Sequence, residues 1–98
     1  MTQLYEPYPA ECPKDLPRHF YDSLKLYLER GCQPGQFLQA VLSNDLVDAV
    51  GRADEEAMAS LRRIVQFVYC SIPSPCWGSR EKVEKWLGGE YKNYEAAA

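Results

Sequence analysis

The sequence predicts an all-α fold, a compact bundle of four to five helices around one central helix. Three observations support this prediction. Residues 54–72 carry apolar side chains at steps of three and four, which places them on one face of a helix. Segments on both sides of this stretch have the same period. No segment of useful length alternates between apolar and polar residues as a strand does.

The central helix is expected over residues 54–72 because both of its ends are marked. Asp54 can accept hydrogen bonds from backbone N–H groups of the first turn, and Glu55 and Glu56 suit the positive end of the helix dipole. Pro73 ends the helix, since the residue before a proline avoids helical geometry. The expected buried stripe consists of Ala57, Met58, Leu61, Ile64, Val65, Val68, Tyr69 and Ile72.

A first helix is expected over residues 15–30. Asp15 can cap it, Pro17 fits its first turn, and Gly31 supplies the left-handed residue that commonly follows a helix C-terminus. Its buried side is expected to consist of Leu16, Phe20, Leu24, Tyr27 and Leu28.

Two short helices, over about residues 35–43 and 45–52, are expected in place of one long helix. The side chains of Ser43, Asn44 and Asp45 compete for backbone hydrogen bonds, and Asp45 can cap a new helix. A bend is therefore predicted between the two pieces.

The last helix is expected to follow an irregular loop at residues 73–78 and to be capped by Ser79. Its inward residues are expected to be Val83, Trp86 and Leu87. The helical domain then spans residues 14–89, between an extended arm at 1–13 and a flexible tail at 90–98. We expect the arm to be ordered only where Leu4, Tyr5 or Tyr8 finds a groove.

Bulk composition limits the classes of partner. The net charge of −3, with acidic and basic residues interspersed, makes nucleic acid an unfavoured partner. No run of about 18 apolar residues and no signal peptide are present, so we expect no membrane contact and a cytoplasmic location. In a reducing cytosol the cysteines are expected to be free thiols; they are Cys12, Cys32, Cys70 and Cys76.

Patterns of catalytic or metal-binding residues are missing from the sequence. The cysteine spacing lacks the pairs that a zinc site needs, and the single histidine, His19, has no neighbouring acid that would complete a catalytic set. No glycine-rich phosphate loop occurs. We therefore expect no enzymatic activity, no cofactor and no metal, with His19 an ordinary surface or partly buried residue.

The first candidate binding site is polar and comprises Asn44, Asp45, Asp48 and Arg52. Positions 45, 48 and 52 share one face of a helix, so they could bind a metal, a cation or a polar ligand. The simpler interpretation is that Asp45 caps the helix and Asp48 pairs with Arg52 on a solvated face. Such a pair contributes only about 0.3–0.5 kcal/mol.

The second candidate is the turn Cys76-Trp77-Gly78-Ser79, together with Arg80. The Trp77 ring could stack a base while the backbone amides of Ser79 and Arg80 hold a phosphate at the helix N-terminus. Alternatively, Trp77 closes the end of the core and its indole N–H donates to a carbonyl. The structural interpretation is favoured because large aromatic residues dominate small cores.

A helix-turn-helix interpretation of residues 35–52 is a minor alternative. It is minor because the DNA groove favours hydrogen-bond donors, whereas the second helix would offer it only one arginine together with an aspartate.

Residues 24–88 resemble a set of small proteins encoded by tailed bacteriophages and prophages. The shared pattern is a helix ending in Gly-x-x-Pro-Gly, a Phe-Leu-x-Ala-Val-Leu-x-Asn-Asp-Leu block, an Ala-Asp pair, and a Cys-Trp-Gly-Ser turn before a Trp-Leu helix. The resemblance implies a phage setting and no particular mechanism. The residues of this sequence that match the shared pattern are Phe37, Leu38, Asn44, Asp45, Leu46, Ala53, Asp54, Cys76, Trp77, Gly78 and Trp86.

Three functions are consistent with these patterns. The leading hypothesis is a non-enzymatic phage accessory protein that binds a host protein and inhibits a bacterial defence system. The second is a protein that binds or sequesters a nucleotide through Asn44, Asp45, Arg52, Trp77 and Arg80. The third is a homo-oligomeric structural or DNA-associated helical module.

Overall fold

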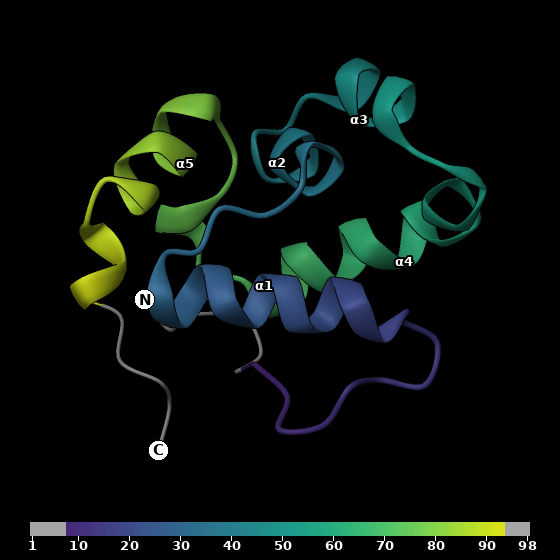
Figure 1. Cartoon of the computed structure of the whole chain (residues 1–98), viewed down its shortest axis with the longest axis horizontal. Helices are drawn as coiled ribbons and strands as arrows, with labels where there is room; N and C mark the ends of the chain where they lie inside the picture. Colours follow the sequence, from purple (N-terminus) through teal and green to yellow (C-terminus); the bar gives the residue numbers. More distant parts are fainter. Residues whose placement is uncertain (1–7, 94–98) are drawn as a thin grey trace.

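The computed structural model describes residues 8–93, and within that range every regular element is a helix, which confirms the all-α prediction. In chain order the elements are α1 (Arg18–Arg30), α2 (Gln36–Leu42), α3 (Leu46–Arg52), α4 (Glu55–Ser71), the 3-10 helix η1 (Ser74–Cys76), α5 (Arg80–Leu87) and the 3-10 helix η2 (Glu90–Asn93). In Figure 1, α1 crosses the lower part of the molecule with the preceding residues 8–17 looping below it, α3 lies at the top, and α2 lies between α1 and α3.

Helix α4 forms where the sequence predicts the central helix. Asp54 caps it by accepting a 2.8 Å hydrogen bond from the Ala57 N–H, and Ile72 before Pro73 ends it. Ile64 and Val68 are fully buried, and Leu61 is partly buried against the core.

The buried side of α4 differs from the predicted stripe. Met58, Val65 and Tyr69 are exposed, whereas Phe67, which was not predicted, is buried. A helix turns by about 100° per residue, so Met58, Val65 and Tyr69 share a strip of their own beside the buried one. The neighbouring helices cover one flank of the apolar face and leave this strip open.

Helix α1 begins later than predicted and has no side-chain cap. Asp15 instead pairs with Arg63 of α4, with 2.8 Å between its Oδ2 and the arginine Nε. Pro17 occupies the N-cap position. The predicted buried residues of α1 are all in the core, and Gly31 ends the helix with a φ of 63°.

Both ends of the described chain pack on the bundle. Tyr8 packs edge-on against Phe67 and donates to the backbone carbonyl of Tyr21, as expected for an arm residue that finds a groove; Leu4 and Tyr5 lie outside the described residues. Residues 90–93, which we assigned to the flexible tail, form η2, because the Tyr91 ring packs over Gly31.

Candidate functional site

The first part of the candidate site is the tight turn that joins α2 to α3. Asn44 adopts a φ of 61°, a left-handed conformation that asparagine tolerates better than most residues. The Asp45 N–H donates to the carbonyl of Ala40, at 2.9 Å, and the Asp45 carboxylate caps α3 by accepting from the Asp48 N–H at 3.1 Å. The predicted bend and its cap are therefore confirmed.

The Trp77 turn lies against this junction. The Gly78 N–H donates to the carbonyl of Leu42 at the end of α2, at 2.7 Å. Ser79 caps α5 by accepting from the Lys82 N–H at 3.2 Å. Arg80 then reaches Asp45, with 3.7 Å between Nη2 and Oδ2. The two candidate sites, which are separate in sequence, thus lie side by side.

The polar part of the site consists of two ion pairs. Besides Asp45 and Arg80, the Arg52 Nε donates to both oxygens of Asp48, at 3.1 and 3.3 Å, and the same guanidinium donates to Gln36. All four charged side chains are partly exposed, so each pair contributes about 0–1 kcal/mol. The pairs border an open hollow of about 710 Å³ lined by Asp45, Val47, Asp48, Gly51, Arg52 and Arg80.

The apolar part of the site is a cavity of about 250 Å³ between α3, α4 and the Trp77 turn. The Trp77 indole N–H donates to the carbonyl of Ile72 at 3.0 Å, and its ring contacts Tyr69 edge-on. This agrees with the structural interpretation of Trp77, whose ring also forms a wall of the cavity. The lining residues are Val41, Asn44, Asp45, Leu46, Ala49, Leu61, Val65, Val68 and Trp77.

Two exposed apolar side chains, Leu46 and Val65, line this cavity, and Tyr69 contacts its Trp77 wall. Of the seven large apolar side chains that are exposed within residues 8–93, six belong to α3 and α4, and only Leu26 lies elsewhere. We call this surface the α3–α4 face; its members are Leu46, Val47, Val50, Met58, Val65 and Tyr69. Sequence reasoning missed these residues as site residues. The sequence shows that three of the seven residues of α3 are large and apolar, but only the structure shows that Ala49 is its one buried residue, so the sequence alone could not identify this surface.

Other reactive groups lie outside the site. His19 is exposed and its Nε2 lies 2.6 Å from Glu56 Oε1. Cys76 is buried, its thiol donates to the carbonyl of Pro73, and burial raises its pKa to about 12. All four cysteines are free thiols. Across residues 8–93, no group of three metal-ligating side chains is placed to hold an ion, and no helix there has the length and apolarity to cross a bilayer.

The fold and the site define the protein as an all-α domain with an apolar cavity beside two ion pairs. Comparison of the chain with protein-family models, with curated proteins and with solved structures found no match.

Proposed function

We propose that this is a non-enzymatic phage accessory protein that acts in the host bacterial cytoplasm by binding a host protein of a defence system. The phage setting rests on the resemblance of residues 24–88. The binding role rests on one observation, the concentration of exposed apolar side chains on the α3–α4 face.

The α3–α4 face has the features of an interaction surface. Its six apolar side chains have exposed fractions between 43% and 84%. Contiguous apolar patches larger than a few hundred Å² are rare on monomeric proteins and mark sites of association. The charged pairs at its edge provide a polar rim around an apolar centre, which is the usual organisation of a protein interface.

The cavity suits an inserted side chain of the partner. Its volume of about 250 Å³ is below the ~300–1,000 Å³ typical of small-molecule sites. The one charged residue that lines it is Asp45, which would repel a phosphate. These two properties support a protein partner with an apolar anchor over the nucleotide alternative.

Three variants test the proposal by affinity capture from bacterial lysate. Val65→Asp places a charge at the cavity, Tyr69→Ala removes an exposed ring beside it, and Leu26→Asp is the matched control on α1. We expect one host protein to be retained by the wild-type chain and by Leu26→Asp, and lost with the other two variants. With the purified partner, Val65→Asp should weaken binding by at least about 30-fold, the effect of removing an interface hot spot.

Two results would contradict the proposal. One is a host protein retained equally by all four chains, and the other is no specific retention at all. Circular dichroism of each variant checks that the helices are intact. A melting shift with a nucleotide, lost on Trp77→Ala, would instead favour the nucleotide-binding alternative.

A further inference from the structure

A second pocket lies between the N-terminal arm and α4, away from the α3–α4 face. Its volume is about 340 Å³, within the ~300–1,000 Å³ typical of small-molecule sites. Helix α4 supplies one wall, which runs from Arg63 to Ser71, and Pro9 and Pro13 of the arm supply another. We call it the arm pocket. At about 100° per residue, Val65 lies about 160° around α4 from Arg63, so the arm pocket and the α3–α4 face are on nearly opposite sides of the helix.

A hydrogen bond at each proline fixes the arm wall of this pocket. The Tyr21 hydroxyl of α1 donates to the carbonyl of Pro9, at 2.7 Å. The Leu16 N–H donates to the carbonyl of Pro13, at 3.2 Å. The pocket is therefore formed without an occupant, as is usual for small-molecule sites.

Arg63 is the positive group of the arm pocket, and two contacts hold it in place. Its Nε donates to Asp15 Oδ2 at 2.8 Å, and its guanidinium carbon lies 5.9 Å from the centre of the Phe67 ring. Within residues 8–93, no acceptor bonds to its two terminal nitrogens, which carry the remaining N–H donors in one plane. A planar fork of donors binds a carboxylate through two parallel hydrogen bonds.

Ser71 is the second polar group that the pocket leaves unsatisfied. Its side chain lines the pocket and is only 6% exposed, and its hydroxyl has no hydrogen-bond partner in the described part of the chain. Buried polar side chains nearly always have a partner. The donor and acceptor of this hydroxyl are therefore available to an occupant that carries a polar group besides its carboxylate.

Asp15 limits the charge that an occupant can carry. Its carboxylate offsets the charge of Arg63 and would repel a second negative charge close to the guanidinium. Pro9, Pro13 and the Phe67 ring offer contacts to an uncharged, apolar body. A ligand with one negative charge therefore fits better than a doubly charged phosphate.

We propose that the arm pocket binds a small carboxylic acid as its carboxylate anion. Arg63 holds the carboxylate, the prolines and Phe67 contact its apolar body, and Ser71 pairs with a second polar group of the ligand. This site is independent of host-protein binding because it uses the other side of α4. Val65→Asp should abolish host binding and leave carboxylate binding unchanged, so failure of one proposal can be distinguished from failure of the other.

Three probes with the same ring and different head groups test the ligand class by NMR titration of the full chain. Benzoate should shift the backbone amide signals of Arg63, Gln66 and Cys70. Neutral benzamide should bind at least about tenfold more weakly, because it cannot form charge-assisted bonds to the guanidinium. Phenyl phosphate should also bind more weakly than benzoate, and Asp15→Asn should reduce that difference by removing the repulsion.

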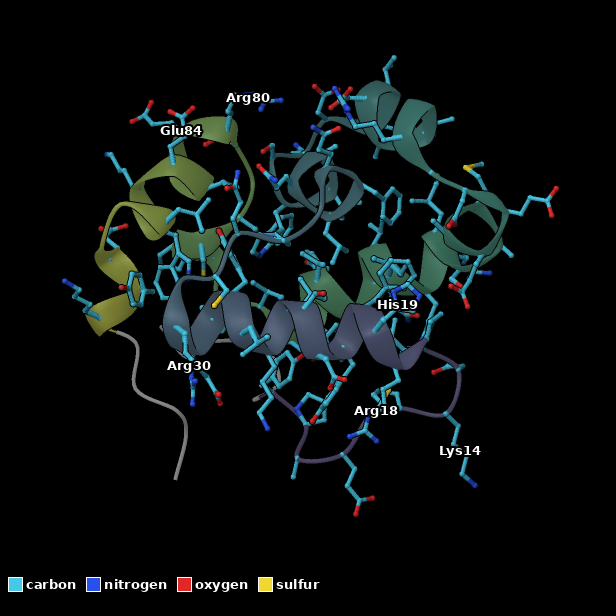
Figure 2. All side chains as sticks on the ribbon, viewed as in Figure 1. Lys14, Arg18, His19, Arg30, Arg80 and Glu84 are labelled. Carbon is cyan, nitrogen blue, oxygen red and sulfur yellow. The ribbon has the colours of Figure 1, made fainter. Side chains whose placement is uncertain are left out.

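Two arginines provide a matched pair of variants. Arg63→Gln should weaken benzoate binding at least about tenfold, and Arg63→Lys should also weaken it because the charge remains but the planar fork is lost. Arg18→Gln is the control. Arg18 also pairs with an aspartate, but Figure 2 shows it beneath α1, and its side chain is 76% exposed. Circular dichroism checks that the helices of each variant are intact.

Hippurate, which adds an amide to the carboxylate and the ring, tests the role of Ser71. It should bind more tightly than benzoate to the wild-type chain, and Ser71→Ala should remove that advantage without weakening benzoate. The proposal is overturned if benzoate causes no shifts at the arm pocket, if benzamide or phenyl phosphate binds as tightly as benzoate, or if Arg18→Gln and Arg63→Gln have equal effects.

Discussion

Two buried aromatic residues connect three elements that are distant in sequence. The Trp86 indole N–H of α5 donates to the backbone carbonyl of Tyr27 in α1, at 2.8 Å. The Tyr27 hydroxyl donates to the carbonyl of Cys76 in η1, at 2.7 Å. Burial raises the pKa of Tyr27 above its ordinary value of 10.0, so its hydroxyl stays a donor into the alkaline range. The C-terminal third of the chain is therefore held on α1 by specific hydrogen bonds as well as by apolar packing.

Replacing Tyr27 by phenylalanine tests how much this hydrogen bond contributes to the free energy of unfolding. The change keeps the ring and leaves the buried Cys76 carbonyl without its donor, which should lower the free energy of unfolding by about 1–3 kcal/mol. Urea unfolding measures the loss. Tyr69→Phe is the matched control, because Tyr69 is 70% exposed and should change stability by less than about 0.5 kcal/mol. Equal effects of the two substitutions would contradict the assigned role of Tyr27.

At the scale of elements, short helices depend on their caps. Asp45, Asp54 and Ser79 each accept a hydrogen bond from the backbone N–H three residues later. These caps matter because helices of fewer than about 12 residues are marginal alone, and α3 and α5 have seven and eight residues. Asp15, although similar in sequence context, caps nothing and holds only a partly exposed pair with Arg63.

The two aspartates Asp54 and Asp15 provide a matched test of capping. Asp54→Ala should lower the free energy of unfolding by about 1 kcal/mol, because the Ala57 N–H loses its acceptor. Asp15→Ala should cost between about 0 and 1 kcal/mol, the range for exposed pairs. Thermal melts of both variants measure the difference. A larger loss at Asp15 than at Asp54 would mean that the helix starts have been assigned incorrectly.

For the whole molecule, buried groups that are neutral when folded set the response to alkaline pH. Burial raises the pKa of the Cys76 thiol from 9.0 to about 12, and it raises the pKa values of Tyr8 and Tyr27 above their ordinary value of 10.0. When folding raises the pKa of an acidic group, that group contributes to the stability of the folded state as long as it is still protonated in the unfolded chain. That contribution is complete below pH 9 and is lost as the unfolded chain ionises at higher pH.

We therefore expect the unfolding free energy to fall between pH 9 and pH 12. Urea unfolding at a series of pH values measures this dependence. Cys76→Ala should lower stability at neutral pH by creating a cavity, and it should also reduce the slope above pH 9, because one fewer group releases a proton on unfolding. An unchanged slope in the variant would show that Cys76 does not contribute.

Local signals in the sequence predicted the helices, the bend at Asn44, the caps at Asp45, Asp54 and Ser79, and buried residues such as Ile64 and Val68. These features depend on residues within about one helical turn of each other, so no knowledge of the fold is needed to find them. The same local signals predicted Asp15 as a cap, which was wrong, because a long-range contact with Arg63 engages its carboxylate instead.

Only the tertiary structure decided which strip of each apolar face is buried and which is exposed. Met58, Val65 and Tyr69 satisfy the helical period as well as Ile64 does, yet they stay largely exposed, because within residues 8–93 no other helix packs fully over their side of α4. The same packing brings Arg80 to Asp45 and Trp77 to Leu46, pairs that lie more than thirty residues apart in sequence. The hydrophobic period determines which residues share the apolar face of a helix. The placement of the neighbouring helices determines which part of that face is buried and which part stays exposed as a possible binding surface.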